Sequence, residues 1–159
     1  MKNIFVLFHL FFVNNIYSQW EYISNKAQRR IEAVGQISFN EYYKDSLIFK
    51  LSKSKDLELS FSIESDLFEN EEAYYVILDM SERKFKVSKS KVETGKYIIF
   101  EIKDMVNSEK FEIEDFLKIF KTGESLTLTI RNNFRVIQGV NQLIGSSSAI
   151  NSVIRNRVP

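Results

Sequence analysis

Hydrophobic and polar residues alternate strictly along one segment of this chain, Leu57-Glu58-Leu59-Ser60-Phe61-Ser62-Ile63-Glu64. Successive side chains of a β-strand point to opposite faces of the sheet, so this order puts the four apolar residues on one face. The segment therefore predicts a half-buried antiparallel strand. Less regular alternation predicts six more strands, at 31–43, 46–52, 84–88, 97–102, 125–131 and 134–143.

The run Ala73-Tyr74-Tyr75-Val76-Ile77-Leu78 differs from these segments because it is apolar at almost every position. A strand that is apolar on both faces is typical of the centre of a sheet that is covered on both sides. We expect a central strand here.

Two segments have the spacing of amphipathic helices instead. At about 113–122, apolar residues recur every three or four positions and Gly123 follows as a stop signal. At about 147–155, a second apolar stripe follows Ser146 and Ser147, either of which is a favourable N-cap residue. The stripes consist of Ile113, Phe116, Leu117 and Phe120, and of Ala149, Ile150, Val153 and Ile154.

Segments of this kind predict a mainly β fold made of one domain. The chain has a single proline, Pro159, and only five glycines, and no stretch has the composition of a linker. We expect residues 19–159 to form an antiparallel β-sandwich or barrel-like domain with two short helices. Periodicity does not reveal strand order, so sandwich and barrel both stay open.

The first eighteen residues have the pattern of a secretory signal peptide. Lys2 precedes an apolar run of about ten residues, whereas a membrane-spanning helix needs roughly twenty. We therefore expect 1–18 to be removed by cleavage between Ser18 and Gln19, leaving no stable membrane span and a periplasmic or secreted product. Leaders that are rich in Phe and Asn and end in Ser-Gln resemble those of Bacteroidetes.

Composition narrows the chemistry of the exported part. The chain has no cysteine, and its one histidine, His9, lies in the leader. Disulfides, a lipid anchor on cysteine and the usual nucleophile–histidine catalysis are thereby excluded. Removal of Lys2 with the leader leaves 21 basic and 21 acidic residues, which disfavours nucleic acid as a partner. We expect no enzyme activity, no cofactor and no metal site.

Five segments resemble one family. They are Trp20-Glu21-Tyr22, the expected strand near 33–39, Leu78-Asp79, Phe116-Leu117-Lys118-Ile119-Phe120-Lys121-Thr122-Gly123, and Ile144-Gly145-Ser146-Ser147-Ser148-Ala149-Ile150. Their order is similar to that of small exported bacterial proteins related to invasion-associated locus B. The resemblance implies a β-sandwich-like exported protein that begins with a Trp-containing strand, and it carries over no catalytic residue.

Two features are candidates for a binding site. Ser146 and Ser147 precede a helix whose first backbone N–H groups can hold an anion, although ordinary helix capping is the explanation that the residue types favour. The pairs Tyr42-Tyr43 and Tyr74-Tyr75 place one ring on each face of a strand, where a ring either joins the core or contacts a partner.

Three charged residues are candidates for a structural role. Asp79 closes an apolar strand, and an acid buried there needs a partner. Arg131 or Arg135, on neighbouring predicted strands, is the partner we expect for it.

These observations lead to a first hypothesis about function, which rests on the classes of protein that the composition excludes. We expect an exported, non-enzymatic binding protein whose partner is another protein in the envelope or outside the cell, and an inhibitor or immunity protein fits this class. A small carrier of apolar ligands inside a barrel is one alternative. A hydrolase that uses only acidic residues is another.

Overall fold

The computed structural model describes residues 19–39, 47–55, 58–70, 72–80 and 83–159. The predicted signal peptide, with Ser18 at its end, and the pair Tyr42-Tyr43 lie outside the described residues. Gln19, the expected first residue after cleavage, directly precedes the first strand.

The described residues form ten strands and two helices. The strands are β1 (Trp20–Asn25), β2 (Arg30–Phe39), β3 (Leu47–Ser54), β4 (Leu59–Glu64), β5 (Tyr75–Met80), β6 (Arg83–Glu93), β7 (Lys96–Asp104), β8 (Lys110–Glu112), β9 (Ser125–Arg131) and β10 (Val136–Gln142). The helices are α1 (Ile113–Phe120) and α2 (Ser146–Arg155).

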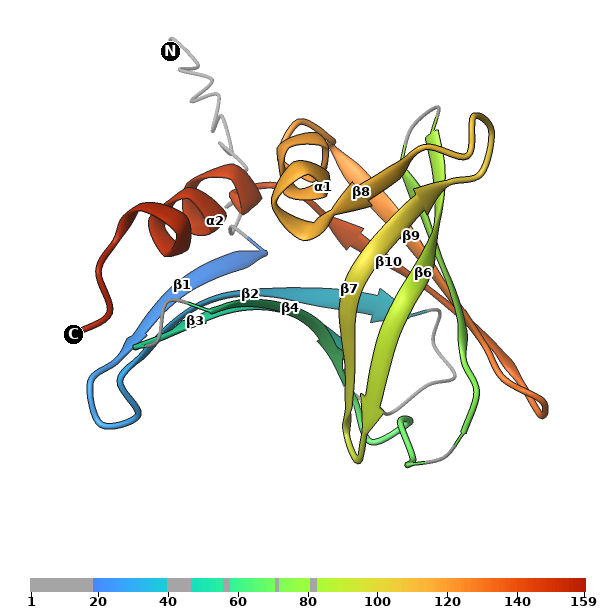
Figure 1. Ribbon diagram of the computed structural model, residues 1–159, viewed down its shortest axis with the longest axis horizontal. Coiled ribbons are helices and arrows are strands. Elements are labelled where there is room, and N and C mark those ends of the chain that lie inside the picture. The colour runs from blue at the N-terminus through green and yellow to red at the C-terminus, as the bar shows by residue number, and fades with distance from the viewer. Residues whose placement is uncertain (1–18, 40–46, 56–57, 71, 81–82) are drawn as a thin grey trace, which may run out of the picture.

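Eight of the strands close into an antiparallel barrel, in the order β2-β10-β9-β5-β6-β7-β4-β3, with β3 pairing back to β2. The other two, β1 and β8, lie outside this circuit, against β2 and β7. Figure 1 shows both helices on one side of the curved sheet made by β1 to β4. The prediction of a mainly β antiparallel fold is confirmed, and the architecture is a barrel.

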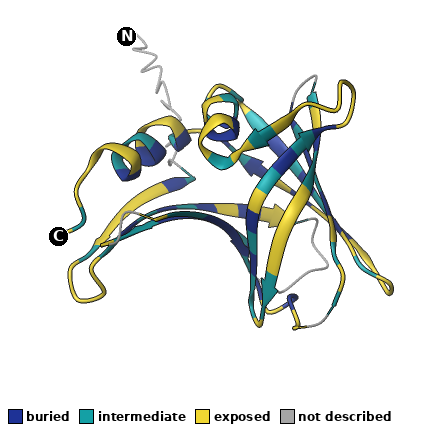
Figure 2. Cartoon of the chain, viewed as in Figure 1, coloured by how far each residue is buried: buried dark blue, intermediate teal, exposed yellow. Residues whose placement is uncertain are grey.

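Burial along the strands follows the alternation in the sequence. Phe61 and Ile63, which lie on the apolar face of β4, are fully buried. Figure 2 shows buried positions alternating with exposed ones along the strands. The prediction that β5 is covered on both faces is wrong, because Tyr75 is exposed and Ile77 only half-buried. The outer face of a closed barrel stays in contact with solvent unless another element covers it.

Both helices form where the apolar stripes predicted them. α1 ends at Phe120, two residues before the expected limit, and α2 begins at Ser146, one residue earlier than expected. α1 turns Phe116, Leu117 and Phe120 inward and covers one end of the core. The ring centroid of Phe116 lies 5.4 Å from that of Phe85, and the ring centroid of Phe120 lies 5.8 Å from that of Phe61.

Closure of the barrel depends on a strand with two partners along one edge. β2 pairs with β1 over Arg30–Gly35 and with β10 only at its far end. The second pairing consists of Ser38 opposite Val140 and Phe39 opposite Gly139. β1 and β10 therefore diverge where β2 passes from one partner to the other.

The indole of Trp20 fills this point of divergence. It lies flat against Gly35, where an added Cβ would stand 2.2 Å from the nearest indole carbon. Its Nε1–H donates to Oδ1 of the buried Asn141 on β10 at 3.0 Å, and the amide of that asparagine donates to the carbonyl of Gln36 on β2. One side-chain amide thus joins β10 to β1 and to β2 at once.

Adding a methyl group at Gly35 should open this junction. We expect Gly35→Ala to lower the free energy of unfolding by about 1–3 kcal/mol, because the new carbon displaces the Trp20 indole. Urea denaturation measures the effect, and Gln36→Ala, at a neighbouring exposed side chain, is the control. In a Trp20→Ala background the same Gly35→Ala change should cost much less. Equal costs in both backgrounds would contradict the close approach of the indole.

Candidate functional site

The serine turn before α2 does not form the expected side-chain cap. The N-cap residue is Gly145, which has a positive φ of 83°, and no side chain caps the helix. Ser146 is fully buried, and its hydroxyl has no hydrogen-bond partner among the described residues. The Ser147 hydroxyl accepts a hydrogen bond from the Asn151 amide at 3.5 Å. The prediction that a serine side chain caps this helix is wrong, because the left-handed glycine makes the turn instead.

Tyr74 has a structural role. Its hydroxyl donates to the Leu67 carbonyl at 2.8 Å and accepts from the Glu69 backbone N–H at 3.0 Å. Its ring packs edge-on against Phe68, with centroids 5.0 Å apart. Burial raises the pKa of the phenol. Tyr74 therefore fastens the loop before β5 to the core and offers little surface to a partner.

Asp79 has a different partner from the one predicted. It lies opposite Lys84 on β6, and its carboxylate stands 3.0 Å from that amine. On its other side it faces Thr127, whereas Arg131 faces Tyr75 four residues further along the strands. The predicted pairing of Asp79 with an arginine is therefore wrong. The observed ion pair is largely exposed, and such pairs contribute only about 0–1 kcal/mol to stability.

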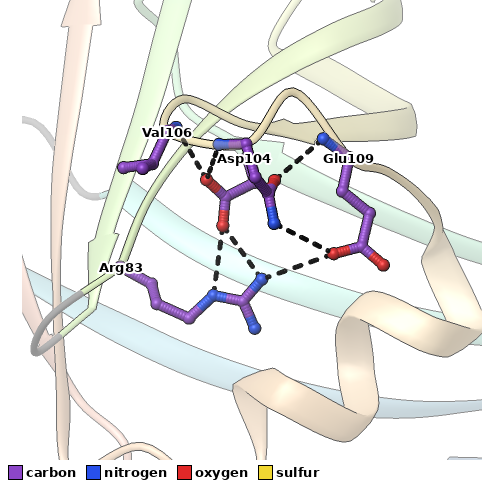
Figure 3. Close-up of polar contacts among 5 residues, drawn as sticks. Arg83, Asp104, Val106 and Glu109 are labelled. Carbon is purple, nitrogen blue, oxygen red and sulfur yellow. Dashed lines mark hydrogen bonds and ion pairs between the residues drawn. The ribbon is translucent and has the colours of Figure 1, made fainter.

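Among the residues that the structure describes, the most buried charge belongs to Asp104, at the end of β7, whose side chain is only 5% exposed. Arg83 donates to one carboxylate oxygen through Nε at 3.1 Å and Nη2 at 2.9 Å. The other oxygen accepts from the backbone N–H of Val106 at 2.7 Å (Figure 3). The guanidinium also lies over the ring of Phe85, with its central carbon 4.9 Å from the centroid.

Hydrogen bonds from the Val106 backbone and from Arg83 hold the pKa of Asp104 below its usual range. Each oxygen of this carboxylate has its own donors, so no free acceptor faces solvent at this point. The arrangement fixes the turn between β7 and β8 (Figure 3) and is structural.

Exposed apolar and cationic residues gather at the free end of the β9–β10 hairpin, which projects from the barrel (Figures 1 and 2). Tyr75, Arg131 and Val136 lie opposite one another on the adjacent strands β5, β9 and β10, and all three are exposed. Phe134, in the turn, is 85% exposed. We call this set the tip patch: Tyr75, Arg131, Phe134, Arg135 and Val136.

Asn132 holds the turn of the tip patch in one shape. Its side-chain oxygen accepts the backbone N–H groups of Phe134 at 3.1 Å and Arg135 at 2.9 Å. Its amide donates to the Glu72 carboxylate at 2.9 Å, which ties the turn to the segment before β5. A hollow of about 200 Å³ lies beside Phe134, lined also by Glu72, Ala73, Asn132 and Asn133. The patch thus presents a protruding ring next to a recess.

The sequence prediction names three of the five tip-patch residues, only one of them for binding, and misses Phe134 and Val136. Tyr75 was a binding candidate, and Arg131 and Arg135 were structural ones. Phe134 was assigned to a strand that begins at residue 134, whereas β10 begins at Val136. The dipeptide Asn132-Asn133 was the available signal, because asparagine favours turns and puts the following phenylalanine at a hairpin end.

The rest of the described structure has no feature of a metal centre or a membrane helix. No group of three or more His, Cys, Asp or Glu side chains gathers there in a way that would hold a metal ion. Among the helices of the described residues, none has both the length and the apolar character needed to cross a membrane.

No family model, no curated protein and no solved structure matches this chain. The resemblance to proteins related to invasion-associated locus B therefore stays a prediction. The tip patch has to be interpreted from its own geometry.

The Asp104 carboxylate should make stability depend on pH. A carboxylate with a lowered pKa in the folded state stabilises the fold above its unfolded pKa, near 4, and loses that contribution as the pH falls through its folded pKa. We expect Asp104→Asn to be less stable than the parent at neutral pH and to lose less stability on acidification below about pH 4. Chemical denaturation across this range is the measurement. Asp66→Asn, at an exposed aspartate, is the control, and equal slopes for parent and Asp104→Asn would contradict the assignment.

Proposed function

We propose that this protein is an exported, non-enzymatic binding module whose tip patch recognises a partner protein in the cell envelope or outside the cell. The single observation that carries the proposal is Phe134, a large apolar side chain that is 85% exposed on a hydrogen-bonded turn. Leaving such a ring in water brings the monomer no burial, whereas its transfer into a partner's pocket stabilises a complex.

The residue types of the tip patch support protein recognition. Interface hot spots are enriched in tyrosine, tryptophan and arginine, and they cluster where water is excluded. Tyr75 and Arg131 lie opposite each other in the sheet, with Val136 on the next strand. A partner that covers this row buries an apolar side chain, an aromatic ring and a guanidinium together.

Rigidity of the turn strengthens the argument. The three side-chain hydrogen bonds of Asn132 fix the backbone that carries Phe134 before any partner arrives. A side chain that is already in its bound position loses less conformational entropy on binding, which favours affinity. The two arginines have no ion-pair partner within the described part of the chain, so an acidic rim on the partner would complement them.

The alternatives to a binding module gain less support. An apolar-ligand carrier needs space inside the barrel, whereas rings from β3, β4, β6 and α1 stand 5.4–6.4 Å apart at the end that α1 covers. A hydrolase that relies on acids needs two carboxylates facing one substrate. The tip patch contains no acidic residue, so this surface offers no such pair.

Affinity capture from crosslinked envelope and culture medium would identify the partner, and substitution of Phe134 would test the surface. We expect Phe134→Ser to raise the Kd for the captured partner about tenfold or more, because burial of a phenylalanine contributes about 1.5–3 kcal/mol. Val106→Ser removes an apolar side chain that is also 85% exposed, but at another turn, and should leave the Kd unchanged.

A photo-crosslinking residue at position 134 should join the protein to its partner, while the same residue at position 106 should not. Equal Kd values for parent and Phe134→Ser, with both proteins equally stable to heat, would refute the tip patch as the recognition surface.

A further inference from the structure

β7 has a shared edge of the same kind as β2, three strands away in the barrel through β3 and β4. It pairs with β4 over Lys96–Ile99 and with β8 over Glu101–Lys103. β4 continues along β3 at Leu59 and Ser60, beyond the last residue that it pairs with β7. The sheet therefore forks at Phe100, between the start of β4 and the junction of β8 with α1.

A β-bulge marks this fork. Lys89 lies opposite Glu101 and Ser90 lies opposite Ile99, so Phe100 has no residue opposite it on β6. A bulge bends the strand and changes the direction of a side chain, and bulges are frequent beside functional sites. The Phe100 ring is 42% exposed at the fork although the strand around it is largely buried.

A groove of about 760 Å³ occupies the fork. This volume lies within the range of roughly 300–1,000 Å³ that is usual for ligand sites. Its apolar lining comes from β4, β7 and the first turn of α1 and consists of Leu59, Ile98, Ile99, Phe100 and Ile113. We call this groove the fork groove.

Acidic side chains exceed basic ones around the fork groove. Lys89 and Lys91 line it from β6, and Lys91 is paired with Glu93 at 2.7 Å. Asp115 is paired with Lys118 at 2.7 Å. Three lining carboxylates have no ion-pair partner within the described residues: Glu58, Glu112 and Glu114. An occupant with positive charge would complement Glu112 and Glu114 at the α1 end of the groove and Glu58 at the start of β4.

We propose that the fork groove is a second binding site, independent of the tip patch, and that it takes an extended peptide segment of a partner in which an apolar residue is flanked by lysine or arginine. The apolar residue packs against Phe100 and Ile113. The flanking cations meet Glu58 and Glu112 at the two ends. On the side away from β3, the edge of β4 at Leu59 and Ser60 pairs with no other strand of the described residues and is available to the peptide backbone.

The shape of the groove favours a peptide over a compact small molecule. Its lining runs from the start of β4, with Glu58, past Phe100 of β7 to the first turn of α1, with Glu112 and Glu114, so its acidic groups come from two separate elements. An extended chain can place one apolar and two charged side chains along such a lining, because its side chains project at regular intervals.

Fluorescence anisotropy with labelled, end-blocked nonapeptides tests the proposal on the purified protein. The probes carry a central phenylalanine flanked by lysines, by glutamates or by serines in an otherwise Gly-Ser background, and free phenethylamine serves as a small-molecule competitor. We expect saturable binding of the lysine-flanked peptide, weaker binding of the serine-flanked one, and none of the glutamate-flanked one. High salt should weaken the binding, and phenethylamine should compete poorly.

Substitutions connect the binding to the groove. Phe100→Ser should weaken it about tenfold or more, and Ile113→Ser, from the other wall, should act in the same direction. Glu58→Gln and Glu112→Gln should each weaken it about two- to fivefold, and Glu112→Lys should shift the preference toward the glutamate-flanked peptide. Phe134→Ser and Glu21→Gln are matched controls outside the groove and should have no effect.

Any of four results would overturn the proposal: no saturable binding of any peptide, equal binding of the lysine- and glutamate-flanked peptides, full competition by phenethylamine, or binding that survives both Phe100→Ser and Ile113→Ser. Circular dichroism of each variant shows that it is folded. Because Phe134 lies outside the groove, failure here leaves the proposal for the tip patch standing, and failure of the tip patch leaves this one standing.

Discussion

The barrel depends on one geometric constraint: a single edge of β2 must pair with two strands, β1 and β10. Along this edge, β2 pairs with β1 over most of its length and with β10 only through its last two residues. So short a pairing would be a weak closure by itself, because two residue pairs supply few ladder hydrogen bonds. The buried contact of Trp20 with Gly35 and Asn141 reinforces it with a ring, a close backbone approach and a side-chain amide.

The same constraint on β7 leads to a different outcome. There the fork is not filled by an indole, and a bulge directs Phe100 toward solvent beside a groove. Packing around α1 fills one end of the barrel. Phe116 and Phe120 are buried at that end, whereas Phe100 at the fork and Phe134 at the hairpin end are among the apolar side chains that stay exposed. The chain carries almost equal numbers of positive and negative side chains, yet the tip patch holds two arginines and no acid, whereas acidic residues outnumber basic ones around the fork groove.

Local sequence predicted the elements well because their signals are local. Alternation over eight residues put Phe61 and Ile63 on the inner face of β4, and helical spacing located α1 and α2 to within two residues at each end. The short strand β8 (Lys110–Glu112) was missed, because three residues are too few to show a period. Tyr75, Arg131 and Arg135 were recognised as candidates for a role, but nothing in their spacing along the chain indicated that they share one surface with Phe134.

The sequence by itself thus determined both helices, most of the strand segments with the face that each buries, and the absence of histidine and cysteine from residues 19–159. Only the tertiary structure decided that the sheet closes as a barrel, that Asp79 pairs with Lys84, and that forks form at β2 and β7. The physical reason is distance along the chain. Hydrophobic periodicity reports which side of a segment faces the core, whereas strand order, ion-pair partners and grooves arise from contacts between segments as far apart as Trp20 and Asn141.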